Sequence, residues 1–224
     1  SHELRTPLNA IIGFSAFMKS EVYGPLGHEK YTEYVGDVEK SGRHLLDLVN
    51  EVLDISAIEA NQIDLAENEV DLAELLHATV RMLLERAARA GVTLLVEPDD
   101  NIPLVYIDGT RMKQVFLNLV GNAIKFSKLD TTVSVRVHYA VGKGFEILVE
   151  DQGIGIEASD LERVMKPFVQ VGSNNYGSHE GVGLGLYISR QLVELHSGTL
   201  IVESEPGQGT SVIVTLPDSR KRVS

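Results

Sequence analysis

One long helical pattern restricts the fold of this 224-residue chain more than any other feature of its sequence. From His28 to about Asn61, apolar residues recur every three or four positions, and no proline interrupts them. These residues are Tyr31, Tyr34, Val35, Val38, Leu45, Leu48, Val49, Val52, Ile55 and Ile58. The spacing predicts a single long helix with a continuous apolar stripe along one side.

A shorter helical segment precedes the long one and separates polar from apolar residues. In SHELRTPLNAIIGFS, residues 1–15, His2 and Thr6 are four positions apart and share one face of a helix. The apolar residues of another face are Leu4, Leu8, Ile11 and Ile12. The segment EVYGPLG, residues 21–27, contains two glycines and a proline and predicts a turn between two antiparallel helices. On this pattern alone, a solvated terminal histidine explains His2 better than a functional one.

The apolar stripe of this hairpin needs a surface to pack against, because two helices alone bury too little. A second copy of the hairpin supplies that surface in a four-helix bundle. We therefore expect a homodimer. The alternative is that the stripe packs on the rest of the same chain.

Beyond about residue 62 the periodicity changes to short strands that alternate with helices. Helices are predicted at 71–90, 109–126 and 182–196. Strands are predicted at 92–97, 104–108, 132–140, 144–151, 198–204 and 209–216. We expect an α+β chain of two domains, the hairpin at 1–62 and a mixed domain at 63–224, with a charged tail at 218–224 that frays.

The composition limits which classes of partner the chain can bind and which cellular compartment we expect for it. The formal net charge of −12 argues against nucleic acid as a partner, because such binding relies on clustered Lys and Arg. A single anionic nucleotide remains compatible, since backbone amides, a metal ion and a few local cations can hold one. The chain has no cysteine, no apolar run near the roughly 20 residues of a membrane span and no leader of the signal-peptide type. We expect a cytoplasmic fragment that makes no membrane contact itself.

The predicted helix 109–126 carries a polar stripe that suits a metal-bound nucleotide. Gln114, Asn118, Asn122 and Lys125 follow one another at spacings of four, four and three, and so lie on one face of the helix. Amide oxygens can coordinate Mg²⁺, and a lysine can bind phosphate. An ordinary solvent-exposed polar face is the alternative interpretation.

Two glycine-containing turns follow, one after a strand and one before a helix. In VEDQGIGI, Asp151 can accept a hydrogen bond from an exocyclic amine, while Gly153 and Gly155 let the backbone approach a ring. In GVGLGLYISRQLVELHSG the glycines precede an amphipathic helix, whose first N–H groups can hold phosphate. Those glycines are Gly181, Gly183 and Gly185. Each turn alone is weak evidence, because glycine turns are common.

The stretch between the two turns, residues 157–180, has neither a strong period nor a long apolar face. A long loop between two binding segments is typical of a lid or of a disordered segment. We expect Phe168 to anchor this loop by packing its ring.

Five segments together resemble a known family. SHELRTPLNAIIGF, NLVGNAIKFS, DQGIGI, KPFVQV and GVGLGLYIS resemble, in order, the H, N, G1, F and G2 boxes of sensor histidine kinases of two-component signalling. The resemblance covers nearly the whole chain and makes His2 the expected phospho-acceptor.

The family's fold and ATP site follow as implications. The resemblance implies a dimerisation and phosphotransfer hairpin at 1–62 and, at 63–224, an α/β sandwich of the Bergerat type shared with gyrase, MutL and the heat-shock chaperones. Asp151 would bind the adenine amino group, Asn122 would coordinate Mg²⁺, and Asn118 and Lys125 would lie near the phosphates. The other implied ATP-site residues are Gly153, Gly155, Phe168, Gly181, Gly183, Leu184 and Gly185.

The reaction is implied in the same way. ATP would phosphorylate His2, Glu3 would accept the ring proton, and an aspartate of a response-regulator receiver domain would take the phosphoryl group. Thr6 matches the position that in this family orients water to dephosphorylate the regulator, so a second, phosphatase activity is expected.

Two other classes of function are compatible with parts of the sequence. A nucleotide-binding pseudokinase would regulate a partner without turnover, but His2, Asn122, Asp151 and the glycines form a complete set. An ATPase of the same sandwich family acting as a clamp leaves HELRTP and the hairpin unexplained. Because the chain starts one residue before His2, whereas the family's first helix begins upstream, we expect a truncated first helix that frays.

Overall fold

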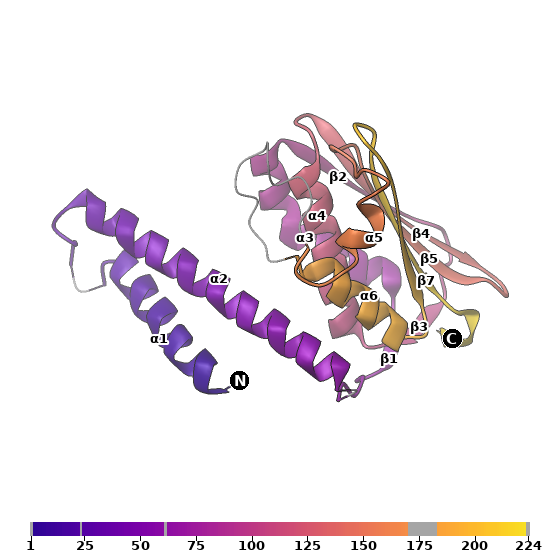
Figure 1. The fold of residues 1–224 in the computed structure, drawn as a ribbon, viewed down its shortest axis with the longest axis horizontal. Helices are drawn as coiled ribbons and strands as arrows, with labels where there is room; N and C mark the ends of the chain where they lie inside the picture. The colour runs from indigo at the N-terminus through magenta and orange to yellow at the C-terminus, as the bar shows by residue number, and fades with distance from the viewer. Residues whose placement is uncertain (1, 23, 61, 170–182, 223–224) are drawn as a thin grey trace. The chain divides into compact units, whose positions relative to one another are not determined.

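The structure is a computed structural model, and it divides into two compact units, Ser1–Ile63 and Asp64–Ser224. It describes residues 2–22, 24–60, 62–169 and 183–222; at 2–5 and 7 this description covers the backbone only. The order of elements confirms the expected fold class, a helical hairpin followed by an α/β sandwich (Figure 1).

The first unit is a hairpin of α1 (His2–Lys19) and α2 (Glu29–Glu59). His28 caps α2, because its Nδ1 accepts a hydrogen bond of 3.1 Å from the backbone N–H of Lys30. The helices approach closely at Gly42, where a β-carbon would lie 3.0 Å from Cγ1 of Ile12. Glycine at this position therefore lets the two helices pack.

Much of the apolar surface of the hairpin is exposed within the chain. Leu8 and Ile12 are buried, but Phe14 is 69% exposed. We call the exposed set the hairpin stripe; it consists of Ile11, Phe14, Phe17, Met18, Val22, Tyr31, Tyr34, Val38, Leu45 and Val52. An exposed apolar surface of this extent is typical of an interaction site.

The second unit is a five-stranded sheet with helices over one face (Figure 1). The strands in spatial order are β2 (Val92–Pro98), β4 (Thr131–Ala140), β5 (Gly144–Asp151), β7 (Gly209–Leu216) and β6 (Thr199–Glu205). Only the β2–β4 pair is parallel. The covering helices are α3 (Leu72–Ala90), α4 (Gly109–Phe126) and α6 (Gly185–Leu195). A one-turn helix, α5 (Leu161–Val164), also lies in this unit.

Local sequence signals explain where these helices begin and end. Asp71 caps α3 by accepting a 3.0 Å hydrogen bond from the N–H of Glu74, and Gly91 ends α3 in the left-handed conformation. The core between the helices and the sheet consists of fully buried apolar side chains. Its largest members are Phe116, Phe145, Leu72, Leu76, Ile107, Met112, Leu119, Ile124, Ile147, Leu184, Leu192 and Leu216.

Residues 218–222 of the charged tail form regular structure, so for this part the expectation of a frayed tail was wrong. A short helix (Asp218–Arg220) leads into β8 (Lys221–Arg222), which pairs with β3 (Leu104–Ile107) beside β1 (Asn68–Val70). Arg220 forms an ion pair with Glu67 and donates a 3.0 Å hydrogen bond to the carbonyl of Tyr106. These partners lie more than a hundred residues away, so local composition could not reveal them.

A buried polar node joins the start of α4 to the end of α6. His196 is 0% exposed; its Nε2 accepts a 3.0 Å hydrogen bond from the N–H of Asp108, and its Nδ1 lies 2.7 Å from the carbonyl oxygen of Leu192. Asp108 also caps α4 and accepts from the N–H of Ala66 at 3.0 Å. Through Asp108, these hydrogen bonds therefore link the segment at Ala66 to the start of α4, the helix that carries the polar stripe.

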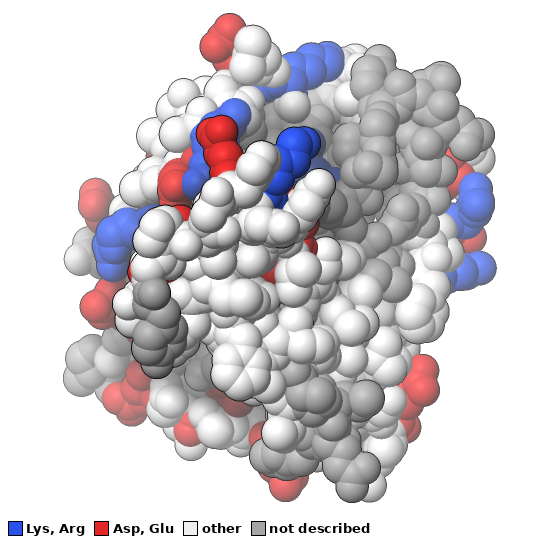
Figure 2. All heavy atoms as spheres, turned by 90° about the vertical axis from the view of Figure 1, so that its left-hand side faces the viewer, with Lys and Arg blue, Asp and Glu red and all other residues white. Residues whose placement is uncertain are grey.

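No described helix is both long and apolar enough to cross a bilayer. On the face shown in Figure 2, Lys and Arg side chains lie among Asp and Glu side chains.

Candidate functional site

The amide stripe predicted on helix 109–126 lies on α4, and α6 holds it in place. Asn118 Nδ2 donates a 2.9 Å hydrogen bond to Oγ of Ser189 on α6, and Asn122 Nδ2 donates to Asn118 Oδ1 at 3.3 Å. Lys125 lies one turn further, with Nζ 4.8 Å from the centroid of the Phe126 ring. All three polar residues are half-buried rather than fully solvated. The stripe is therefore an ordered polar surface and not an ordinary exposed helix face.

The start of α6 packs against this stripe because its first residue is glycine. A β-carbon at Gly185 would lie 2.2 Å from Oδ1 of Asn118, far closer than real contacts allow. Leu184, just before it, is fully buried and fixes the start of the helix in the core. Gly183 has φ of +77°, which favours glycine. The first N–H groups of α6 therefore lie beside the amides of α4, where both can bind phosphate.

Asp151 ends β5 with one carboxylate oxygen held in place. Its Oδ1 accepts hydrogen bonds from the N–H groups of Gly153 at 2.8 Å and Thr210 at 3.3 Å. Burial raises the pKa of this carboxyl, and the two backbone hydrogen bonds lower it by less. Its other oxygen, Oδ2, has no hydrogen-bond partner within the described residues. Asp151 can therefore accept a hydrogen bond from a ligand.

The loop after β5 joins Asp151 to the end of α4. Ser127 and Gly153 form a β-bridge, and Ile154 N–H donates to the carbonyl of Phe126 at 3.2 Å. A β-carbon at Gly153 would lie 2.3 Å from that carbonyl, and one at Gly155 would lie 2.0 Å from the Glu205 carbonyl. Both glycines are therefore required by close backbone contacts. They bring the carboxylate of β5 and the amides of α4 to the same end of the unit.

Phe168 anchors its loop through the backbone and not through ring packing, so that expectation was wrong. Its ring is 60% exposed, whereas its N–H donates a 3.1 Å hydrogen bond to the carbonyl of Gly183. Phe168 has φ of +63°, a strained value for a bulky residue. The backbone bond, rather than apolar burial, thus joins the two ends of the intervening segment. Gly181 lies outside the described residues.

The predicted phosphotransfer residues lie at the start of α1. His2 and Glu3 fall in its first turn, and their side chains are outside the described part. Thr6 is exposed one turn later. The hairpin and the nucleotide-type residues belong to separate units.

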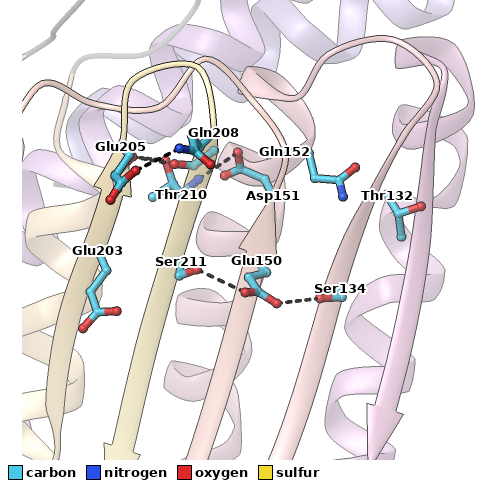
Figure 3. A pocket seen from close by; sticks show the side chains of 12 residues that line it. Thr132, Ser134, Glu150, Asp151, Gln152, Glu203, Glu205, Gln208, Thr210 and Ser211 are labelled. Atoms are coloured by element: carbon cyan, nitrogen blue, oxygen red, sulfur yellow. Dashed lines mark hydrogen bonds between the residues drawn. The ribbon is translucent and has the colours of Figure 1, made fainter.

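The sheet has a hollow of about 550 Å³ on the face away from the helices (Figure 3). Glu150 lies in it and accepts hydrogen bonds of 3.4 Å from Ser134 and from Ser211. The hollow is lined by the carboxylates of Glu150, Asp151, Glu203 and Glu205; Glu150 forms an ion pair with Arg136, and no Lys or Arg is among the lining residues themselves. A triphosphate would be repelled there, so the helix side, with Asn118 and Lys125, is the better nucleotide site.

Three site residues were missed by sequence reasoning. Thr210 holds Asp151 through its N–H, and Ser204 supports Thr210 with a 3.0 Å contact between their hydroxyl oxygens. Ser189 is 2% exposed and orients Asn118. A polar residue on the apolar side of α6 was the available signal for Ser189. The turn GQGTS, between two predicted strands, was the signal for Thr210.

A divalent ion fits this donor set only together with phosphate. No group of three or more His, Asp or Glu side chains in the described part of the chain can hold a metal ion. Asn122 uses its amide N–H on Asn118, which leaves its amide oxygen without a hydrogen bond inside the described ranges. Mg²⁺ is commonly held by one or two protein oxygens plus substrate phosphates. The amide oxygen of Asn122 suits that role.

Comparison with known families matches both units. Residues 107–220 match the histidine kinase-, DNA gyrase B- and HSP90-like ATPase family. Residues 1–61 match the His Kinase A (phospho-acceptor) domain.

Individual relatives agree with these matches. The chain is 43% identical to the non-motile and phage-resistance protein and 44% identical to the histidine protein kinase DivJ, both of Caulobacter vibrioides, over 97% of its own length. It spans 26% and 36% of those two proteins. The crystal structure of full-length ShkA in complex with AMPPNP has a similar fold, with a TM-score of 0.84 and 30% identity over 100% of this chain and 45% of ShkA.

Proposed function

The chain belongs to the histidine kinases that combine a phospho-acceptor domain with this ATPase domain, and we propose that it phosphorylates His2 with ATP and passes the phosphoryl group to a response regulator. In this proposal residues 1–62 carry the phospho-acceptor and residues 63–224 bind ATP. The regulator supplies an aspartate of a receiver domain.

The single observation that carries the ATP assignment is how the two carboxylate oxygens of Asp151 are hydrogen-bonded. One oxygen is fixed by two backbone N–H groups, and the other has no described partner at the end of the strand. An exocyclic amine such as the adenine amino group is a donor that matches a fixed carboxylate oxygen. Gly153 and Gly155 let the loop after β5 pass close to the carbonyls of Phe126 and Glu205, which holds Asp151 near the end of α4.

The phosphates would extend along α4 from the adenine. Asn118, Lys125 and the first N–H groups of α6 would bind them. Asn122 would hold Mg²⁺ through its amide oxygen. When bound with ATP, this ion would offset negative charge on the phosphoryl group.

The chemistry at His2 is a phosphoryl transfer from oxygen to nitrogen. A lone pair on the neutral imidazole attacks the γ-phosphorus, an N–P bond forms, and the bond to the β,γ-bridging oxygen breaks as ADP leaves. The Glu3 carboxylate accepts the proton from the other ring nitrogen. The receiver aspartate then attacks the phosphorus, the N–P bond breaks, and the imidazole regains a proton.

The hairpin stripe supports a homodimer. Its residues are exposed within the chain, and a second copy of the same stripe would bury them in a four-helix bundle. Association of this kind gives the hairpin the core that two helices lack.

Autophosphorylation tests the proposal directly. The 224-residue chain, incubated with γ-labelled ATP and Mg²⁺, should gain an acid-labile, alkali-stable label. His2→Gln should abolish that label, whereas His44→Gln, at an exposed histidine of α2, should keep it. A label that persists in His2→Gln would contradict the phospho-acceptor assignment.

Asp151→Asn separates ATP binding from folding. Oδ1 of the new amide would keep both backbone hydrogen bonds. Its NH₂ group, however, would face the amino group of adenine, and two donors cannot form a hydrogen bond with each other. We expect an at least tenfold weaker affinity for ATP, with an unchanged or higher melting temperature, because a desolvated carboxylate is removed. Calorimetric titration and thermal unfolding measure the two effects. Wild-type affinity in this variant would rule out Asp151 as the adenine acceptor.

In the autophosphorylation experiment, a wild-type chain that binds ATP but gains no label would favour a non-catalytic scaffold.

Thr6 favours a second activity, dephosphorylation of the regulator. It is exposed one helical turn from His2, where a hydroxyl can orient water. With any receiver domain that accepts the label from His2, Thr6→Ala should slow loss of the label from the aspartate while leaving autophosphorylation intact. Equal rates of loss in Thr6→Ala and the parent would exclude this role.

A further inference from the structure

Arg86 of α3 lies across the helix that carries the amide stripe. A β-carbon at Gly121 of α4 would lie 3.2 Å from Nη1 of Arg86 and 3.9 Å from its Cζ. The guanidinium therefore lies against the α4 backbone at Gly121, and a β-carbon there would require it to shift by a few tenths of an ångström. Gly121 is buried, although the Arg86 side chain above it remains exposed.

The position of Gly121 places this guanidinium beside the amide stripe. Residues three and four apart on a helix are surface neighbours, so Gly121 adjoins Asn118 on one side and Lys125 on the other. Asn122 is the next residue in the chain. Gly121 also lies five residues before Phe126, about 8 Å along the helix axis from the end that contacts the Asp151 loop. This separation suits the path from a bound adenine to its phosphates.

Arg86 carries a permanent charge that no described residue neutralises. Its side chain forms no hydrogen bond or ion pair within the described ranges. On the same helix, Arg89 pairs with Glu85, and elsewhere Arg190 pairs with Glu194. The chain has 32 acidic residues against 20 basic ones, so carboxylates are plentiful. A guanidinium that lies on a glycine one helical turn before Lys125, and that has no described carboxylate partner, is suited to bind an anion.

We propose that Arg86 binds the terminal phosphates of ATP, and that its charged side chain reaches from α3 to the site on α4. This inference rests on the proposed ATP-binding function and adds a residue outside the five family segments. The planar fork of the guanidinium can donate two parallel hydrogen bonds to phosphate oxygens. Gly121 is the feature of α4 that gives Arg86 room to reach them.

A second arginine of α3 provides a matched control. Arg81 is also exposed and also lacks a described partner, but it lies five residues away and rests on no glycine of α4. An arginine that is merely solvated would behave in the same way at either position.

The test is the affinity for adenine nucleotides with Mg²⁺, measured by calorimetric titration of the whole chain. Arg86→Ala should weaken ATP binding about tenfold, weaken ADP binding less and leave AMP binding unchanged. Arg86→Lys should recover part of the ATP affinity, because it keeps the charge but loses the fork. Arg81→Ala should bind all three nucleotides like the wild type. Gly121→Ala, whose β-carbon requires the guanidinium to shift by a few tenths of an ångström, should weaken ATP binding in the same direction but by less than Arg86→Ala does.

The outcomes separate the two proposals. If the wild type binds ATP and Arg86→Ala binds it as tightly as Arg81→Ala does, the role of Arg86 is overturned and the proposed function stands. An equal loss of affinity for AMP and ATP would also overturn it, because that result indicates a structural effect on the whole site. Failure of the wild type to bind ATP would overturn both.

Discussion

The two units of this protein use apolar residues in opposite ways. In the ATP-binding unit, Phe116 is 0% exposed and belongs to a core closed by helices and sheet. In the hairpin, Phe14 is 69% exposed, and the rest of the hairpin stripe is similarly uncovered. The hairpin thus needs a partner surface to bury its side chains, whereas the core of the ATP-binding unit is closed within one chain.

The largest expected effect separates the two kinds of phenylalanine. Phe116→Ala should lower the free energy of unfolding of the ATP-binding unit by about 3–5 kcal/mol, because it leaves a cavity in a closed core. Phe14→Ala should lower the free energy of unfolding of the hairpin by less than about 1 kcal/mol, because that ring is already in solvent within the chain. Urea unfolding at a low protein concentration, where association is minimal, measures both. Similar losses in the two variants would contradict the contrast between the units.

A smaller effect is expected on association. Phe14→Glu places a charge in the hairpin stripe of each copy, so it should raise the dissociation constant of the dimer at least tenfold. Asn9→Glu adds the same charge at an exposed position of α1 outside the stripe and is the control. Sedimentation over a range of concentrations compares the variants. ATP affinity should be equal in all of them, because the nucleotide residues lie in the other unit. Identical self-association of both variants would place the dimer interface elsewhere.

The smallest effect concerns pH and is confined to the ATP-binding unit. Burial lowers the pKa of His196; Arg220 lowers it further, while the Leu192 carbonyl, Glu67 and Asp108 raise it by less. The unfolded chain takes up a proton near pH 6.5, whereas the folded chain resists it. Stability from this group is therefore complete above about pH 6.5 and declines as pH falls towards the lowered pKa, by at most about 1.4 kcal/mol per pH unit.

Unfolding free energies at pH 7.5, 6.5 and 5.5 measure this dependence. His196→Gln should be less stable at every pH but should lose the part of the slope that lies just below pH 6.5. A slope that is the same in wild type and variant would assign the pH dependence to other groups.

Much of the fold was accessible from sequence because it depends on local periodicity. The long helix predicted from His28 to Asn61 is α2, and the helices predicted at 71–90 and 109–126 match α3 and α4 within a residue or two. The alternating strands were found as well, since one buried face repeats every second residue. β1, β8 and α5 were missed, because elements of two to four residues are too short to show a period.

The sequence alone determined most of the proposed ATP-site residues and their order, because four short segments carry them. The tertiary structure decided what those residues touch. Gly185 packs against Asn118 across 67 positions, His196 accepts a hydrogen bond from Asp108 across 88, and Arg86 rests on Gly121 in a neighbouring helix. Contacts of this kind depend on how helices cross over a common sheet and leave no periodic trace in either segment. The roles proposed for Gly121, Ser189 and Arg86 therefore depend on how the helices pack together.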